Sequence, residues 1–382
     1  MKIVYFSNAV LNESGLEERI LVTSQAGNLR SRHIYDIISK CNKNTVFLSQ
    51  GPGKMGGIKK TVNKRPLKEG FSEIYLGYIG EGIIQWISSI ILTTFWLFRN
   101  ISQDDIVITY NFMPQNSIPI ICTKLFKRYR LVIEFEELYG LMDMPHGWIY
   151  KTLEDYGIKK ANAFIASSHH IADEIQRHHE KPIDIAISHG YFNNTQNTQI
   201  TNPPNKGRLK ILYSGTLNEE RGISNLITLM THVRDFADLL ITGNGPLSSI
   251  IDNSQSKNEN IQYFGYLNDQ EFNKLLKSVH ICINPTLKES NFAKCSFPSK
   301  IVYYLSNSKI VLSTQLSVIQ RSEYNDMIIY FDENDPLQFR EKLLEIWKNF
   351  DKLSENSKEF PEKLESIQKR EYSDICKLLN KK

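Results

Sequence analysis

Charged side chains follow several predicted strands in the second half of the chain. Arg221 follows a strand expected at 210–213, Glu289 follows one expected at 281–284, and Lys300 begins a predicted helix. Arg and Lys at such positions bind phosphate groups without a metal, because helix N-termini and the guanidinium fork both favour anions. A cation at a helix N-terminus opposes the helix dipole, and an anion held between Arg221 and Lys300 would relieve that conflict. The pattern favours a phosphate site over solvated surface charges.

Two glycine-containing turns accompany these charges. Residues 211–217 read ILYSGTL and residues 241–247 read ITGNGPL, and each is a strand followed by a turn and a helix. Such turns let the backbone approach a phosphate, or they serve only as tight strand–helix connections, and the residues alone leave both interpretations open. The candidate ligand-binding positions at and after these turns are Gly215, Thr216, Gly243, Asn244, Gly245, Tyr266, Asn291, Phe292, Ser299 and Tyr303.

Three carboxylates stand at the end of a strand expected at 131–135. These are Glu134, Glu136 and Glu137, of which Glu134 and Glu136 alternate onto one strand face. They form either a solvated strand end or a group that hydrogen-bonds the hydroxyls of an acceptor. The second interpretation is favoured, because the carboxyl ends of parallel strands face the ligand side of a doubly wound sheet.

Two further patterns predict neither a metal nor a cofactor. The histidine pairs at 169–170 and 178–179 are too far apart on one helix to share a metal ion. The stretch QGPGKMG at 50–56 matches the dinucleotide pattern G-x-G-x-x-G, but no helical apolar stripe follows it, and Pro66 interrupts the region. We therefore do not expect NAD. The glycine-rich, basic segment 51–70 suits either an anionic membrane surface or a solvated loop.

Strands alternate with helical patterns through both halves of the chain. The expected strands are 2–6, 45–48, 72–76, 106–110, 131–135, 163–166, 183–187, 210–213, 239–242, 261–264, 281–284, 310–312 and 327–330. This alternation predicts an α/β fold with two doubly wound, Rossmann-like domains of parallel strands that face each other across a cleft. The expected parts are a first domain at 1–192, a polar linker at 193–207, a donor-binding domain at 208–360, and a helix at 361–382 that packs back on the first domain.

Composition limits the class of protein. The chain has 382 residues, 41% hydrophobic and 23% charged, which is typical of a soluble protein with two domains. Its 46 basic and 42 acidic residues are too balanced to predict a nucleic-acid partner.

Five scattered cysteines predict reduced thiols in a cytoplasmic protein. The most apolar run, 83–98, is shorter than the roughly 20 residues of a membrane span, and we expect a buried rather than an interfacial helix.

In their order and spacing, these stretches resemble the nucleotide-sugar glycosyltransferases of the GT-B fold, most closely the retaining family 4. SKIV at 308–311 is similar to the family's G-K-P-V, ANAFIASS at 161–168 to its A-D-x-x-x-x-x-S, and SHGY at 188–191 to its P-N-G-V. Three positions depart from the pattern. Thr216 replaces the Arg of G-R-L, Arg221 replaces the Lys of K-G, and Tyr303 replaces the second Glu of the Glu pair that begins at Glu289.

The resemblance implies transfer of a sugar, of hexosyltransferase type, from a nucleoside diphosphate to a hydroxyl acceptor. The acceptor would be a glycan or lipid-linked saccharide in cell-envelope or capsular polysaccharide synthesis, and the protein would be cytoplasmic or peripheral at the inner face of the plasma membrane. The candidate positions at and after the glycine turns would bind the donor. Transfer would retain the anomeric configuration without a metal, and Arg221, Lys300 and Glu289 would be the catalytic residues. A nucleotide-sugar epimerase and a non-catalytic partner subunit on the same fold are the alternatives.

Overall fold

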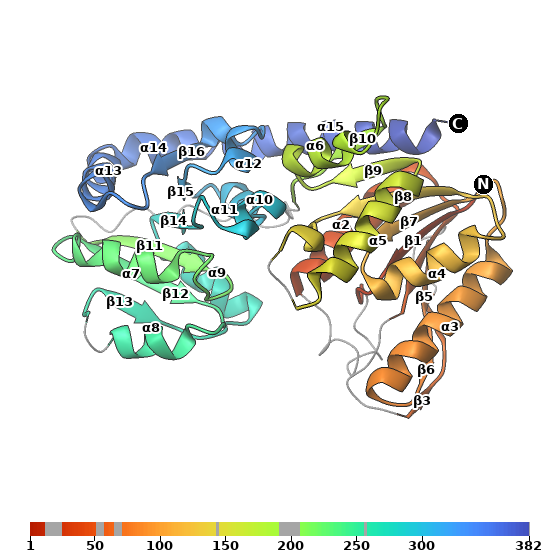
Figure 1. Ribbon diagram of the computed structural model, residues 1–382. Coiled ribbons are helices and arrows are strands. Elements are labelled where there is room, and N and C mark those ends of the chain that lie inside the picture. Colours follow the sequence, from red (N-terminus) through yellow and green to blue (C-terminus); the bar gives the residue numbers. More distant parts are fainter. Residues whose placement is uncertain are drawn as a thin grey trace. The chain divides into compact units, whose positions relative to one another are not determined.

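The computed structural model describes residues 1–11, 25–50, 57–64, 71–142, 145–190, 207–255 and 258–381 (Figure 1). The chain divides into two compact units. The first comprises Met1–His189 and Arg370–Lys382, and the second comprises Gly190–Lys369. Almost all of the linker expected at 193–207 lies outside the described residues.

The first unit is built on an eight-stranded sheet with the order β10-β9-β8-β7-β1-β2-β5-β4. Its strands are β1 (Ile3–Ser7), β2 (Thr45–Ser49), β4 (Val62–Lys64), β5 (Phe71–Tyr75), β7 (Ile106–Tyr110), β8 (Arg130–Phe135), β9 (Ala163–Ala166) and β10 (Ile185–Ile187). All neighbours are parallel except β4, which is antiparallel to β5. Its helices are α2 (Gln25–Cys41), α3 (Gly82–Asn100), α4 (Pro114–Lys124), the short η1 (Tyr139–Leu141), α5 (Gly147–Lys160), α6 (His169–Arg177) and the last turns of α15 (Phe360–Asn380).

The second unit has a six-stranded parallel sheet with the order β13-β12-β11-β14-β15-β16. Its strands are β11 (Leu209–Ser214), β12 (Ala237–Thr242), β13 (Ile261–Tyr263), β14 (Ile281–Asn284), β15 (Ile310–Thr314) and β16 (Ile328–Phe331). Its helices are α7 (Ile223–Thr231), α8 (Ser248–Gln255), α9 (Asp269–Lys277), α10 (Asn291–Cys295), α11 (Lys300–Ser306), α12 (Ser317–Gln320), the short η2 (Asn325–Met327), α13 (Pro336–Lys348), α14 (Phe350–Ser357) and the first turns of α15.

Both sheets are buried on two faces, which explains their continuous apolar strands. In β1, Ile3 and Tyr5 belong to one hydrophobic core while Val4 and Phe6 belong to another. Successive side chains of a strand point to opposite faces, so one apolar run fills both cores. Every strand expected from the sequence is present, and the predicted α/β fold with two doubly wound sheets is confirmed.

The region after QGPGKMG forms strands. Residues 51–56, which hold the glycine pattern, lie outside the described residues, as do residues 65–70. Between them are β4 and β3 (Ile58–Lys59), and β3 pairs with β6 (Tyr78–Ile79) in a two-stranded antiparallel sheet. A dinucleotide fingerprint is followed by a helix, whereas residues 57–64 contain the strands β3 and β4.

The apolar helix expected to be buried is mostly exposed, and that prediction is wrong. α3 covers the run 83–98, and its buried residues are Gln85, Ser89, Ile90, Thr93 and Leu97. By length and composition, α3 is the one helix in the described part of the chain that could cross a membrane, and 17% of its most apolar 18-residue window is buried. An apolar run cannot show from composition alone whether its stripe faces a core or the outside.

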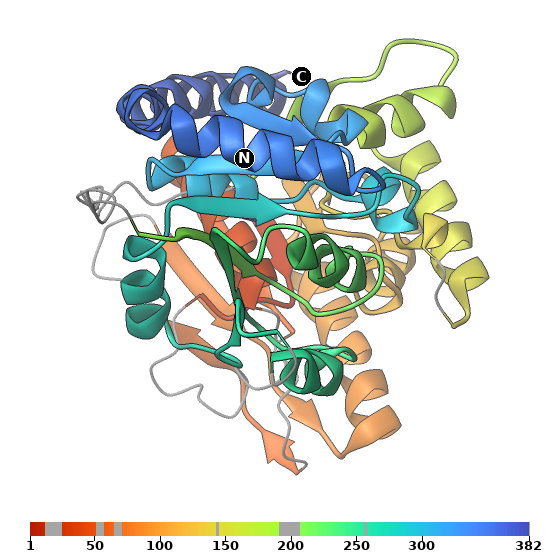
Figure 2. The same cartoon turned by 90° about the vertical axis from the view of Figure 1, so that its left-hand side faces the viewer.

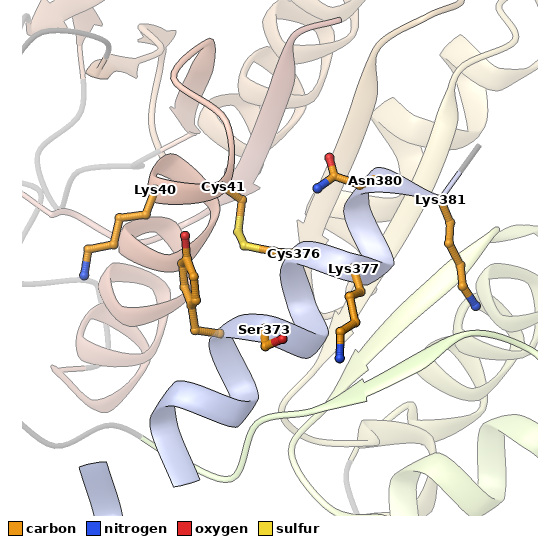
Figure 3. Close-up of a pocket in the computed structure, with 8 residues that line it drawn as sticks. Lys40, Cys41, Ser373, Cys376, Lys377, Asn380 and Lys381 are labelled. Atoms are coloured by element: carbon orange, nitrogen blue, oxygen red, sulfur yellow. A yellow bond between two sulfur atoms is a disulfide. The ribbon is translucent and has the colours of Figure 1, made fainter. Parts of the chain in front are cut away.

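The end of α15 is joined to the end of α2 by a disulfide between Cys41 and Cys376 (Figure 3). The expectation of reduced thiols is therefore wrong for this pair. Ile375 and Leu379 of α15 belong to a core of the first unit. The disulfide borders a surface hollow of about 700 Å³ whose other lining residues are Lys40, Tyr372, Ser373, Lys377, Asn380 and Lys381.

We predict a pH-dependent stability of the second unit from His280. Its Nδ1 accepts a hydrogen bond of 2.8 Å from the Lys210 backbone N–H, and its ring lies against Trp347 and Phe350. Burial, followed by the charges of Lys309 and Lys210, lowers the pKa of His280 to about 4. An unfolded histidine has a pKa near 6.5.

Between these two pH values the unfolded chain binds the extra proton, so the free energy of unfolding should fall as pH falls from about 6.5 to about 4. Urea unfolding of the wild type and of His280→Gln at pH 7.5 and pH 5 measures this. The variant should lose part of the difference between the two pH values. An unchanged difference would show that His280 does not cause it.

Candidate functional site

The loops after β11 and β14 pack closely in the second unit. Gly222, which precedes α7, has a φ of +71°, and a Cβ atom there would lie 1.9 Å from the backbone oxygen of Pro285. The backbone N–H of Leu287 donates to the Glu220 oxygen at 3.1 Å. This packing places the Arg221 guanidinium 3.3 Å from the centre of the Phe292 ring. The ring helps to hold the guanidinium in place, because a cation is attracted to the face of an aromatic ring.

Lys300 extends toward the same strand end. Its Nζ donates to the Ser214 hydroxyl at 3.1 Å and lies 5.1 Å from the centre of the Phe272 ring. Although part of the residue is exposed, loss of water around the ammonium group lowers the pKa of Lys300, and the Arg221 charge lowers it further. The Asp269 charge acts in the opposite direction. Lys300 thus lies at the carboxyl end of β11, where the charge of Arg221 acts on it.

The two glycine turns interlock through their backbones. Gly243 has a φ of +129°, and a Cβ there would lie 1.9 Å from the Gly215 oxygen. At Gly245 a Cβ would lie 2.3 Å from the Leu217 oxygen. The Leu217 N–H donates to the Asn244 oxygen at 3.1 Å. These contacts account for the glycines by packing, and the same packing positions the turn that precedes Arg221.

Gly243→Ala should therefore strongly destabilise the second unit, because backbone atoms cannot move aside as a flexible side chain can. Gly265→Ala is the matched control. Gly265 also has a positive φ, +63°, but a Cβ there meets no atom within 4 Å. Thermal unfolding should show a much larger loss of Tm for Gly243→Ala than for Gly265→Ala. Equal losses would mean that backbone strain, rather than close approach, makes glycine necessary.

The remaining predicted donor residues differ in exposure. Ser299 and Tyr303 are half-buried, and the Tyr303 hydroxyl donates to Asn273 Oδ1 at 2.9 Å. Four predicted residues are exposed, namely Thr216, Asn244, Tyr266 and Asn291. Their side chains are accessible to a ligand.

Glu289 lies in solvent rather than against Arg221 or Lys300. Its side chain is 94% exposed, and its carboxylate lies 3.5 Å from Lys294 Nζ. The following Ser290 caps α10 by accepting from the Ala293 N–H at 3.1 Å. The cap fixes the backbone at Glu289 and leaves its carboxylate in solvent, so its expected catalytic role stays a prediction.

Glu134 of the first unit is not accessible to solvent, and the prediction that it binds acceptor hydroxyls is wrong. The residue is fully buried on β8. One of its oxygens accepts from Arg30 Nε at 2.7 Å and the other from the Tyr5 hydroxyl at 2.6 Å. Both oxygens thus have partners inside the unit. Glu134 is therefore neither a solvated residue at a strand end nor a group that binds a ligand, but one half of a buried ion pair.

Glu136 and Glu137 remain candidates for the acceptor side. Both are half-buried. The Glu136 carboxylate accepts from the Tyr110 hydroxyl, and its backbone N–H donates to Asn111 Oδ1 at 2.9 Å. Asn111 directly follows β7, is fully buried, has a φ of +50°, and leaves its Nδ2 without a hydrogen-bond partner. The left-handed backbone and the unsatisfied amide of this buried asparagine make the strand end a candidate site.

Comparison with known proteins places this geometry in a known fold. Residues 194–364 match the family model for glycosyl transferases group 1. Solved structures match over the whole chain. A sucrose-phosphate synthase from Thermosynechococcus elongatus is 9% identical, has a TM-score of 0.73, and the alignment covers 99% of this chain and 98% of that one.

The chain has the GT-B fold of glycosyltransferases. A lipopolysaccharide outer core galactosyltransferase, 14% identical with a TM-score of 0.61, matches 98% of each chain. A trehalose-6-phosphate synthase studied for glycosyl transfer with retention is 9% identical, has a TM-score of 0.67, and is covered over 98% of its length and all of this chain. No curated protein sequence matches the chain.

Three residues of this candidate site were not predicted from the sequence. Ser214 receives the Lys300 hydrogen bond, Phe272 lies under the Lys300 ammonium group, and Asp269 acts on its charge. Ser214 could have been found, because it is the last residue of a strand that precedes a glycine turn. Phe272 and Asp269 belong to α9, whose sequence reads as an ordinary amphipathic helix.

Proposed function

We propose that this GT-B protein transfers a sugar from a nucleoside diphosphate to a hydroxyl acceptor. The observation that carries the proposal is the placement of two cations by the carboxyl end of β11, where Lys300 donates to the Ser214 hydroxyl and the Arg221 charge lowers the pKa of Lys300. A diphosphate bound there would attract both cations, since charge-assisted hydrogen bonds to phosphate are strong.

The same pair suits the chemistry of the leaving group. As the glycosidic bond to the diphosphate breaks, negative charge grows on the phosphate oxygens. Cations already fixed in place stabilise that charge without further rearrangement. Phe292 holds Arg221 in place, and Ser214 holds Lys300 in place. These residues can stabilise the leaving group without a metal, and we propose a metal-independent transfer.

We further propose that transfer retains the anomeric configuration, as the resemblance to family 4 implies. The trehalose-6-phosphate synthase among the similar structures was studied for glycosyl transfer with retention. The acceptor is proposed to be a glycan or lipid-linked saccharide of the cell envelope or capsule. The similar lipopolysaccharide galactosyltransferase, which is named for an outer-core acceptor, supports that choice.

Incubation with a panel of UDP-, GDP- and ADP-sugars tests the proposal. One donor should release its nucleoside diphosphate, slowly with water and faster with a saccharide acceptor. The anomeric signals of the product in proton NMR would report retention. Addition of EDTA should leave the rate unchanged.

The alternatives give different results in the same assay. An epimerase would change the sugar of the donor without releasing diphosphate. A non-catalytic partner subunit would do neither. Either result, or a rate abolished by EDTA and restored by a divalent cation, would contradict the corresponding part of the proposal.

A further inference from the structure

An apolar stripe of α3 is open to solvent in the first unit. Ile83 is 73% exposed, Ile91 60% and Phe95 62%, and Ile87 lies between them. Residues four positions apart lie on one helix face, so these side chains form a continuous stripe. The adjoining exposed apolar residues are Ile58, Ile79, Ile84, Trp86, Phe98, Leu125 and Phe126. Together they make up what we term the α3 surface.

The inward face of α3 is more polar than this outward stripe. Gln85, Ser89 and Thr93 are buried, and the helix packs against α4. The Thr93 hydroxyl donates to the Ser89 backbone oxygen at 2.7 Å, which satisfies it within the helix. A helix of a soluble protein turns its apolar stripe toward the core, whereas α3 buries only Ile90 and Leu97 of its large apolar residues and leaves most of the others exposed. An outward stripe of this size marks a binding surface.

The β3–β6 sheet lies by one end of α3 (Figures 1 and 2). There the Ile79 N–H donates to the Ser88 hydroxyl at 2.9 Å, and Ile79 pairs with Ile58 in the sheet. At the other end of α3, the Phe98 and Phe126 rings lie 5.6 Å apart. The exposed apolar side chains of the β3–β6 sheet and of the segment after α4 therefore extend the α3 stripe.

The charged residues in the segments that carry this surface are mostly basic. In residues 58–60, 79–100 and 124–128 the single acidic residue is Glu81. The basic residues there are Lys59, Lys60, Arg99, Lys124, Lys127 and Arg128. Lys60, Arg99 and Arg128 are exposed. Apolar side chains bordered by cations complement a bilayer that carries anionic headgroups, whereas a protein partner would require no such excess of basic residues.

We propose that the α3 surface docks into the interfacial layer of an anionic lipid bilayer, with α3 lying parallel to the membrane plane. A spanning orientation would expose Gln85, Ser89 and Thr93 to lipid and remove α3 from α4, and both would cost free energy. Membrane docking needs no sugar transfer. Its outcome is therefore separable from that of the proposed function, although docking would bring the enzyme to a lipid-linked acceptor.

Vesicle co-sedimentation of the full chain tests the proposal. Vesicles of phosphatidylglycerol and phosphatidylcholine are compared with vesicles of phosphatidylcholine alone, at low and high salt. The wild type should pellet with the anionic vesicles at low salt and bind at least tenfold more weakly at high salt or without anionic lipid. Trp86 fluorescence, isolated by subtracting a Trp86→Phe variant, should be quenched by brominated lipid.

The double variant Ile91→Gln, Phe95→Gln should bind at least tenfold more weakly. Its matched control is Ile250→Gln, Leu337→Gln, which removes two exposed apolar side chains from the second unit and should bind as the wild type does. A wild type that stays in the supernatant with anionic vesicles at low salt would overturn the proposal. Equal binding by both double variants would also overturn it, as would a wild-type dimer that the α3 variant dissociates without any vesicle binding.

Discussion

Arg221→Ala is expected to lower the turnover of donor sugar by about 10²- to 10³-fold, the range for loss of one fixed transition-state donor. The guanidinium lies 3.3 Å from the Phe292 ring centre and close enough to Lys300 to lower its pKa. Removing it deletes half of the charge that would stabilise the leaving diphosphate. Release of nucleoside diphosphate, followed over a range of donor concentrations, gives kcat and KM separately.

The second unit supplies a matched control for this change. Arg340 also lies over an aromatic ring, 5.2 Å from the centre of Phe236, and it pairs with Asp235 on the surface. Arg340→Ala should leave kcat within about twofold of the wild type, since exposed ion pairs contribute little. Lys300→Ala should resemble Arg221→Ala. If Arg221→Ala kept nearly full kcat, the phosphate site would be elsewhere.

Arg30→Met is expected to destabilise the first unit by about 3–5 kcal/mol, the range for breaking one side of a buried ion pair. Arg30 and Glu134 are 4% and 0% exposed, and their N···O distance is 2.7 Å. Burial raises the pKa of Glu134, and the Arg30 charge opposes that rise. Without Arg30, the carboxylate must stay buried without its cation or take up a proton.

Hydrogen exchange of the β8 amides, followed by mass spectrometry, measures this loss of stability in the first unit. The double variant Arg30→Met, Glu134→Gln removes both charges and keeps an oxygen for the Tyr5 hydroxyl. It should recover part of the lost protection. Protection in Arg30→Met that matched the wild type would show that the ion pair does not hold the unit together.

Local patterns predicted the strands well because each strand is an apolar run bounded by polar turns. The strands at 106–110, 163–166 and 281–284 agree residue for residue with the structure. Arg221 and Lys300 were predictable for a related reason. Each stands a fixed, short distance from the end of an element, and parallel strands bring such ends to one edge of the sheet.

Contacts between distant positions were not predictable from local patterns. Glu134 meets Arg30 across 104 positions, and Cys41 joins Cys376 across 335. A carboxylate after an apolar strand looks the same in sequence whether a buried arginine or water faces it. The outward stripe of α3 was missed because amphipathic spacing defines a face without defining its partner.

Calorimetric titration of the wild type with UDP, GDP and ADP tests the central claim, a diphosphate site at Arg221 and Lys300, most directly. One nucleotide should bind with a 1:1 stoichiometry, and the corresponding nucleoside monophosphate should bind more weakly. Arg221→Ala and Lys300→Ala should each weaken diphosphate binding at least tenfold, while Arg340→Ala should not. If none of the three diphosphates bound, or if both site variants bound as tightly as the wild type, the account of this site would be contradicted.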